Sequence, residues 1–240
     1  MKALILNSGM GTRMGDLVSQ HPKCMTKLNN DQTIISRQLQ LLNQMGISEV
    51  VITTGPFEDV LIRHCKSLNL PVNYTFVNNS MYSMTNYIYS IYLAREYLEN
   101  DIVLMHGDLV FEQSVLHDVL NMKESCLAVS STIPLPEKDF KAVIENGKIT
   151  KVGIEYFENA VAAQPLYKLN KTDWMVWLRE IVRFCDTNNV KCYAENAFNE
   201  VSDICNIYPL DIKNRLCREV DTPEDMELVS GMLSAAVSYI

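Results

Sequence analysis

Short hydrophobic runs alternate with longer stretches in which hydrophobic residues recur every three or four positions along the first half of the chain. The short runs predict buried strands, and the longer periodic stretches predict amphipathic helices. The predicted strands are 3–6, 50–53, 72–77, 102–105 and 126–132, and the predicted helices are 34–45, 60–68, 87–98 and 115–122. Strands and helices in this alternation form a mostly parallel sheet that helices cover on both faces.

The second half of the chain carries a different pattern. Two runs at 141–144 and 148–152 are separated by Glu-Asn-Gly, which is typical of a hairpin turn and predicts antiparallel strands. The helices expected here are 174–185 and one that begins at Glu224. No linker rich in proline, glycine or serine interrupts the chain. We therefore expect a single domain over residues 1–240, with a three-layer α/β/α, Rossmann-like fold and a mixed, mostly parallel sheet.

Composition and charge exclude several classes of protein. The net charge of -8 argues against binding to nucleic acid, because such binding requires a basic surface. No segment approaches the ~20 apolar residues that a membrane span needs. The seven cysteines are scattered, without a CxxC pair, and no signal peptide precedes the first strand, so we expect reduced thiols and a cytoplasmic protein. The sequence leaves open whether the protein is a monomer or a homo-oligomer.

The segment Asn-Ser-Gly-Met-Gly-Thr-Arg at 7–13 follows the first predicted strand directly. In a parallel sheet, ligands bind beyond the carboxyl ends of the strands, so this segment is a candidate binding loop. A P-loop would need Lys-Ser or Lys-Thr, and a dinucleotide-binding turn would need a third glycine; neither is present. A sharp turn that binds no ligand is the alternative interpretation.

The run from Leu6 to Arg13, with Pro22-Lys23 after it, resembles the nucleotidyltransferase signature LxxGxGxR followed by Pro-Lys. The resemblance implies that the flexible glycines let backbone amides face a triphosphate, and that Arg13 and Lys23 neutralise its charge during transfer. The nucleotide-binding residues that it implies are Leu6, Asn7, Ser8, Gly9, Met10, Gly11, Thr12, Arg13 and Lys23. The family usually has Ala-Ala in place of Asn7-Ser8, and a proline in place of Gly15-Asp16, which leaves the contact with the base open.

Two aspartates are candidate ligands of Mg²⁺, which nucleotidyl transfer needs and which prefers carboxylate oxygens. Asp108 follows a hydrophobic strand through His106-Gly107, at the same sheet edge as the glycine loop, and His106 is interpreted as a strand-end residue. Asp221 opens the segment Asp-Thr-Pro-Glu-Asp, which resembles a stretch of cytidylyltransferases whose first aspartate binds the metal. The rest of that segment reads as a helix start capped by Thr222, which does not require Asp221. Alternatively, each aspartate is a surface turn residue.

The start of the helix predicted at 87–98 extends the resemblance. Its Asn-Tyr-Ile-Tyr-Ser segment, from Asn86 to Ser90, looks like one in bacterial choline-phosphate cytidylyltransferases and related phosphonate enzymes. The resemblance implies that Asn86 contacts the nucleotide and that Ser90 contacts the acceptor. The alternative is that these residues belong to the core, except Asn86 at the start of the helix, which Thr85 or Asn86 could cap.

The segment at 162–168 also looks like a wall of the acceptor pocket in these enzymes, and Lys168 would there hold the acceptor phosphate. The alternative is a solvated lysine at a strand end. A Tyr-Trp-Asp stretch that contacts the choline cation in this family aligns with Tyr193-Ala194-Glu195. Because the indole is missing and Glu195 could accept hydrogen bonds, we expect a primary ammonium rather than a quaternary one. Alternatively, Glu195 is a solvated loop carboxylate.

Together, these resemblances imply a CTP-dependent cytidylyltransferase in which Arg13, Lys23 and Asp108 are catalytic and Asp108 and Asp221 bind Mg²⁺. An oxygen of the acceptor would attack the α-phosphorus of CTP, and pyrophosphate would leave. The expected acceptors are small amine-bearing phosphates or phosphonates, such as 2-aminoethylphosphonate and phosphocholine. A sugar-1-phosphate nucleotidyltransferase and a catalytically inactive nucleotide-binding regulator are the alternatives, and the presence of both aspartates argues against the second.

Overall fold

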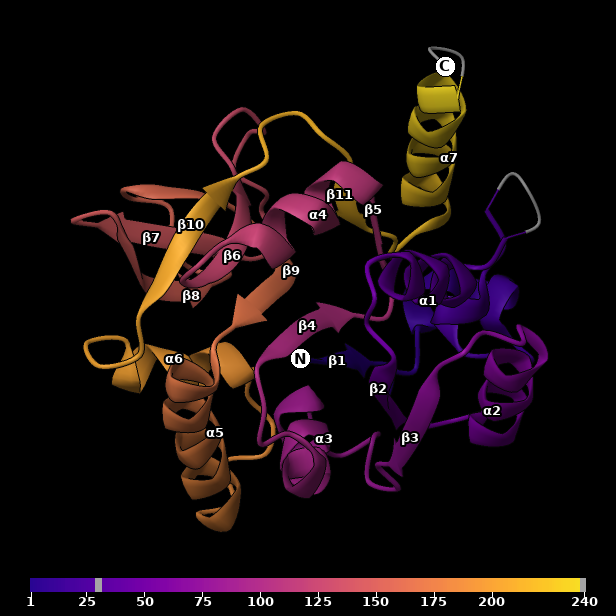
Figure 1. Cartoon of the computed structure of the whole chain (residues 1–240), viewed down its shortest axis with the longest axis horizontal. Coiled ribbons are helices and arrows are strands. Elements are labelled where there is room, and N and C mark those ends of the chain that lie inside the picture. The colour runs from indigo at the N-terminus through magenta and orange to yellow at the C-terminus, as the bar shows by residue number, and fades with distance from the viewer. Residues whose placement is uncertain (29–31, 238–240) are drawn as a thin grey trace.

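Seven strands form the main row of a mixed sheet in the computed structural model, which describes residues 1–28 and 32–237 of the chain (Figure 1). In spatial order they are β10 (Ile207–Asp211), β6 (Ser125–Ser130), β9 (Ala160–Leu169), β4 (Ile102–His106), β1 (Lys2–Leu6), β2 (Glu49–Thr54) and β3 (Asn73–Asn78). Within this described row, β9 alone runs antiparallel to its neighbours. The hairpin of β7 (Lys141–Glu145) and β8 (Lys148–Gly153) joins the sheet through β9. The mixed, mostly parallel sheet and the hairpin are both confirmed.

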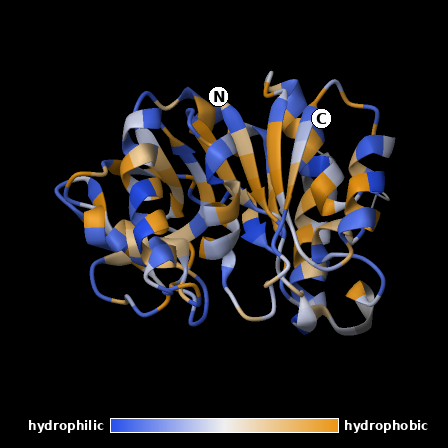
Figure 2. Ribbon diagram, turned by 90° about the horizontal axis from the view of Figure 1, so that it is seen from below, coloured by the Kyte–Doolittle hydropathy of each residue, from blue (hydrophilic) through white to orange (hydrophobic). Residues whose placement is uncertain are grey.

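Helices cover both faces of this sheet, which confirms the three layers. One face carries α1 (Ile34–Gln44), α2 (Glu58–Ser67) and α4 (Gln113–Asn121), and the other carries α3 (Tyr87–Ala94), α5 (Lys171–Asp186) and α6 (Ala194–Val201). Because side chains alternate along a strand, β1 turns Ala3 and Ile5 to the first face and Leu4 and Leu6 to the second. Figure 2 shows hydrophobic residues concentrated on the central strands. None of the described helices is long and apolar enough to cross a membrane.

A small antiparallel pair, β5 (Leu109–Phe111) and β11 (Cys217–Glu219), lies apart from the main sheet. It brings the late segment 217–221 beside the turn that follows β4, where Val220 N donates to Asp108 O at 3.0 Å. The chain then enters α7 (Pro223–Val237), which begins with the predicted cap: Asp225 N donates to the Thr222 hydroxyl at 3.2 Å. The 3₁₀ turns are η1 (Thr12–Val18), η2 (Lys23–Met25) and η3 (Arg95–Tyr97).

Several elements are absent from the sequence-based prediction. The strands β5 and β11 have three residues each, too few for an alternating pattern to show. The strands β9 and β10 contain Pro165 and Pro209, which argue against a strand in a sequence. In the structure, Pro165 lies where the β6–β9 register shifts, and β10 is an edge strand, so neither proline removes a needed hydrogen bond. The helix predicted at 87–98 ends as α3 at Ala94 and continues as η3.

Candidate active site

The carboxyl ends of β1 and β4 lie side by side and bring the glycine loop next to the His106-Gly107-Asp108 turn. Leu6 pairs with His106 in the parallel register, and Gly107 N donates to Leu6 O at 3.0 Å. The Asn7 side chain lies against Gly107, where a Cβ would come within 1.6 Å of the Asn7 amide oxygen. Two segments a hundred residues apart therefore form one surface, as expected for strands that end at the same sheet edge.

The two glycines of the loop differ in what the fold demands of them. Gly11 has a φ of 64°, and a Cβ there would lie 3.1 Å from Cβ of Lys23, so both its backbone conformation and its neighbour favour glycine. A Cβ at Gly9 would have no neighbour within 4 Å. Packing therefore explains Gly11, whereas Gly9 leaves open space beside the loop.

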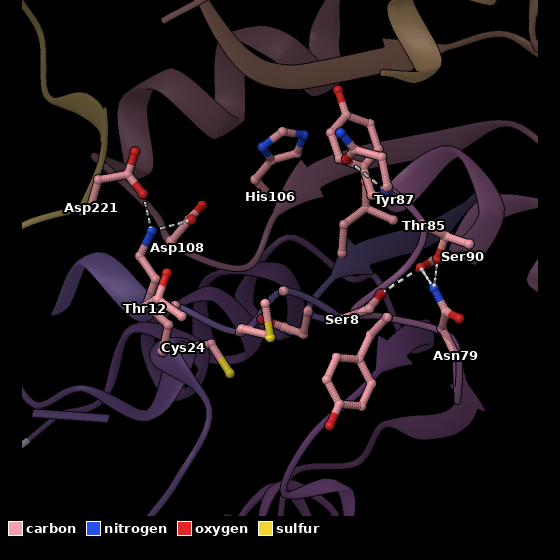
Figure 3. Close-up of a pocket in the computed structure, with 18 of the residues that line it drawn as sticks. Ser8, Thr12, Cys24, Asn79, Thr85, Tyr87, Ser90, His106, Asp108 and Asp221 are labelled. Carbon is pink, nitrogen blue, oxygen red and sulfur yellow. Dashed lines mark hydrogen bonds and ion pairs between the residues drawn. The ribbon is translucent and has the colours of Figure 1, made fainter. Parts of the chain in front are cut away.

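Lys23 connects the two aspartates that the sequence assigned to the metal. Its Nζ lies 2.6 Å from Asp108 Oδ2 and also contacts Asp221 Oδ1, the two contacts drawn as dashed lines in Figure 3. The guanidinium of Arg13 lies 3.0 Å from Asp221 Oδ2. Burial alone would lower the pKa of Lys23, but the charges of both aspartates outweigh it and raise the pKa. Burial alone would raise the pKa of Asp108, and the Lys23 charge instead lowers it. All four residues expected to act on the phosphates are thus brought together.

The donor set around Asp108 fits a hard divalent cation. Its Oδ1 atom is buried and has no hydrogen-bond partner among the described residues, so one carboxylate oxygen is left for another ligand. Asp221 contacts the same Lys23 ammonium as Asp108, which makes it a candidate for a second carboxylate ligand. Ligand atoms of His106, Asp108 and Glu219 also lie within 4.8 Å of one another, which makes Glu219 a further candidate.

A pocket of about 320 Å³ opens over the glycine loop. Its floor is a chain of polar contacts in which Ser8 Oγ donates to Ser90 Oγ at 2.6 Å and Asn79 Nδ2 donates to Ser90 Oγ at 3.0 Å (Figure 3). The Asn86 side chain caps α3 by accepting from Tyr87 N, as predicted, and faces the same pocket. The predicted nucleotide residues line this pocket: Leu6, Asn7, Ser8, Gly9, Met10, Gly11, Thr12, Arg13, Lys23 and Asn86. Ser90, expected at the acceptor, lies here in the floor instead.

A second pocket of about 180 Å³ adjoins the first and shares Arg13, Asn86, Tyr87, His106, Asp108 and Asp221 with it. Aromatic rings form part of its wall: Phe140 and Tyr193 meet edge to face at 5.1 Å, and Tyr87 and His106 at 4.9 Å between centroids. Its other lining residues are Lys138, Asp139, Ile154 and Glu219. We call it the acceptor-side pocket for the role that we propose for it below; Tyr193, which the resemblance assigns to the acceptor, lies in its lining.

The His106–Glu219 pair was not identified as functional from the sequence. His106 Nδ1 lies 2.8 Å from Glu219 Oε1, and both side chains are largely buried beside Asp108. Burial alone would lower the pKa of His106, but the hydrogen bond and charge of Glu219 raise it to about 9. Burial raises the pKa of Glu219 to about 7. The one sequence signal for this pair was the position of His106 at a strand end, because the short β11 that carries Glu219 has no recognisable pattern.

Two expectations about the acceptor are wrong. Lys168 is 5% exposed and donates to Met122 O and Lys123 O, both at 3.0 Å; it pairs with Val103, at the opposite end of β4 from the site. It binds the end of α4 rather than an acceptor phosphate. Glu195 is 1% exposed and accepts hydrogen bonds from the hydroxyls of Tyr87 and Tyr167, so it lies behind the acceptor-side pocket rather than in it.

A family model described as the MobA-like NTP transferase domain matches residues 3–133, which is more than half of the chain. The CTP:phosphoglutamine cytidylyltransferase of Campylobacter jejuni is 28% identical over 160 residues, covering 63% of this chain and 62% of that protein. The CMP-5'-(3-aminopropyl)phosphonate synthase of Streptomyces rubellomurinus is 32% identical over 135 residues, covering 56% of this chain and 21% of that protein. The chain thus spans less than two thirds of the length of either relative.

A sugar-phosphate enzyme is also similar: the D-glycero-alpha-D-manno-heptose 1-phosphate guanylyltransferase of C. jejuni is 23% identical, covering 64% of this chain and 72% of that protein. Among solved structures, the CTP:phosphocholine cytidylyltransferase of Streptococcus pneumoniae matches with a TM-score of 0.79 at 19% identity. That match covers 97% of this chain and 98% of the other and shows a shared fold.

Proposed function

Since the chain belongs to the family of MobA-like NTP transferase domains, we propose that it is a CTP-dependent cytidylyltransferase that couples CMP to a small amine-bearing phosphate or phosphonate. The observation that carries the proposal is the cluster of Arg13, Lys23, Asp108 and Asp221 between two adjoining pockets. Two similar enzymes whose names specify CTP or a CMP product support cytidine as the nucleoside.

The reaction requires little covalent chemistry from the protein itself. An acceptor oxygen attacks the α-phosphorus of CTP, the bond from that phosphorus to the bridging oxygen breaks, and pyrophosphate leaves. Both reactants are anions, so their approach costs electrostatic free energy that cations must offset. Arg13 supplies a positive charge at the border of the two pockets, Lys23 supplies another in the pocket over the glycine loop, and the loop amides orient the triphosphate.

Mg²⁺ is the cation that we propose for this site, held by Asp108 and Asp221. The buried, unpartnered Oδ1 of Asp108 supports this assignment. When bound, Mg²⁺ would supply further positive charge at the phosphates. Lys23, which contacts both aspartates, would then be free to turn its ammonium toward the triphosphate.

The acceptor-side pocket supports a cationic acceptor. Arg13 lies at the border that it shares with the nucleotide pocket, whereas Asp139 and Glu219 add carboxylates to its lining. The exposed Asp139 carboxylate makes no ion pair or side-chain hydrogen bond with the described residues, so it can accept hydrogen bonds from a primary ammonium. This role replaces the one expected of Glu195, and we again favour 2-aminoethylphosphonate over phosphocholine.

The test is mass spectrometry of the products formed from each of the four nucleoside triphosphates with a panel of acceptors. The panel contains 2-aminoethylphosphonate, phosphocholine, phosphorylated amino acids and sugar 1-phosphates. We expect a CMP conjugate of an amine-bearing acceptor and equimolar pyrophosphate. The absence of any conjugate from a folded chain that binds nucleotide would contradict the proposal and favour the inactive regulator.

A sugar-1-phosphate nucleotidyltransferase is the second candidate, and the similarity to the heptose 1-phosphate guanylyltransferase favours it. The same panel separates the two, because that activity would yield a nucleoside diphosphate sugar and no conjugate of an amine.

A further inference from the structure

Lys141 is a buried cation that lines neither substrate pocket. It is the first residue of β7, and its exposed fraction is 0%. A lysine without solvent loses the hydration of its ammonium, and burial correspondingly lowers the pKa of Lys141. Such a side chain needs other partners.

Backbone carbonyls provide those partners. The ammonium of Lys141 donates to Ile154 O at 2.6 Å, to Asp139 O at 3.1 Å and to Glu137 O at 3.5 Å. The ring of Phe157 lies 4.2 Å from the nitrogen and adds a cation–π contact. An ammonium has three N–H donors, and here Ile154 O and Asp139 O accept the two short hydrogen bonds while Glu137 O makes a longer contact.

The three carbonyls belong to two segments that border the acceptor-side pocket. One segment, 131–140, leads from β6 to β7, and the other, 154–159, leads from β8 to β9; neither forms a helix or strand (Figure 1). The first contributes Lys138, Asp139 and Phe140 to the pocket lining, and the second contributes Ile154. The β7–β8 pairing holds the near ends of the two segments together at Lys141 and Gly153. Beyond that pair the segments share no ladder of backbone hydrogen bonds, so their spacing there depends on side-chain contacts.

We propose that Lys141 is a positioning residue for the acceptor: its ammonium ties these two segments together and so sets the width of the pocket wall. The proposal rests on the proposed function, because it takes the acceptor-side pocket as the place of the acceptor. Lys141 acts through the backbone of Asp139 and Ile154 and touches neither substrate. Its loss loosens the wall, which weakens acceptor binding and reduces discrimination between acceptors of different length, while the CTP side of the site is unaffected.

The experiment compares Lys141→Met with Lys148→Met in the full chain. Methionine keeps most of the buried chain length of lysine and removes the ammonium. Lys148 is a matched control in the same hairpin. Its ammonium also donates a hydrogen bond, in its case to the side-chain oxygen of Asn206, and contacts a ring, that of Tyr208, away from both pockets. For each variant, KM and kcat are measured for CTP and for the acceptor that the wild type uses, and kcat/KM is measured for an analogue one methylene longer.

For Lys141→Met we expect the acceptor KM to rise about 10-fold or more, with the CTP KM within about twofold of the wild type. The preference for the natural acceptor over the longer analogue should fall about fivefold, because a one-methylene preference depends on a fixed wall. Lys148→Met should match the wild type in all three quantities. If Lys141→Met does not fold, Phe157→Leu is measured instead. Phe157 is 52% exposed, and its ring makes one of the contacts with the Lys141 ammonium. The acceptor KM should then rise about threefold.

An active variant with an unchanged acceptor KM, or with equal rises in the KM of both substrates, would overturn the role of Lys141 and leave the proposed function intact. A wild-type chain that transfers nucleotide to no acceptor would overturn the proposed function, and the role of Lys141 with it.

Discussion

Lys23 is enclosed by carboxylates to a degree that its sequence position does not indicate. Its side chain is 12% exposed and contacts both Asp108 and Asp221, whereas Arg13, with a side chain that is 62% exposed, contacts Asp221 from the solvent side. The two cations therefore differ in mobility and in role. The exposed Arg13 side chain can move toward a ligand, whereas Lys23 also offsets the repulsion between two largely buried carboxylates.

Replacing either aspartate should abolish most turnover. In Asp108→Asn and Asp221→Asn, kcat should fall by about 100-fold or more, because each loses a carboxylate that would stabilise charge at the phosphates. Steady-state kinetics and circular dichroism check the result. Asp118→Asn is the control, since Asp118 pairs with Arg215 at the surface and should turn over normally. Near-normal kcat in an active-site variant would remove that aspartate from the site.

Gly107 is required by Asn7 rather than by its backbone conformation. Gly107→Ala should lower the free energy of unfolding by about 1–3 kcal/mol, because the new methyl group would collide with the Asn7 amide. Asn7→Ala should relieve that collision, so the double variant should recover most of the loss in urea unfolding. Additive losses from the two substitutions would contradict the contact.

At the scale of elements, the site depends on the pairing of β5 with β11. This short pair carries Glu219 and Asp221 from the end of the chain to His106 and Asp108 at the end of β4. Three-residue strands have no pattern of their own, and tertiary contacts decide whether they form. The long helices α1 and α5 lie close to their expected ranges. Each carries an apolar stripe that is stable only when it packs against the sheet, so the periodicity of the sequence predicts the helix.

The His106–Glu219 contact should make stability depend on pH. The pKa of His106 is raised from 6.5 to about 9 in the folded chain, so the stabilisation is fully present below pH 6.5 and is lost as the pH rises through 9. Urea unfolding with EDTA between pH 6.5 and 9.5 should show this loss in the wild type and a flatter profile in His106→Gln. His117→Gln, a change at an exposed histidine, should behave as the wild type, and parallel profiles for all three would refute the coupling.

At the scale of the whole molecule, a net charge of -8 opposes the approach of a triphosphate. Binding therefore depends on local features of one sheet edge: Arg13, Lys23 and the amides of the glycine loop. That edge collects residues from the beginning, middle and end of the chain, so a ligand there connects all three regions. Nucleotide binding should accordingly stabilise the entire fold.

CTP with Mg²⁺ should raise the melting temperature by about 5–10 °C at a free concentration near 100 times its Kd, since about 2.7 kcal/mol of binding free energy is added to the folded state. Differential scanning fluorimetry with each of the four triphosphates measures it. We expect a smaller shift with ATP, GTP and UTP. Equal shifts with all four would contradict the preference for cytidine but not the binding of a triphosphate.

The alternation of strands and helices, the hairpin, and the loop at the end of the first strand could all be predicted from the amino-acid sequence. These follow from local information: hydrophobic periodicity, turn residues and the fixed direction of a parallel strand. The sequence also identified Arg13, Lys23, Asp108 and Asp221, because short signatures carry their own spacing. Which residues line the acceptor-side pocket depends on tertiary structure. Lys168 and Glu195 turn away from the acceptor-side pocket, and Asp139, Phe140 and Glu219 line it. Side chains far apart in sequence meet only where β9, α6 and β11 pack, and no local pattern encodes the distances across that packing.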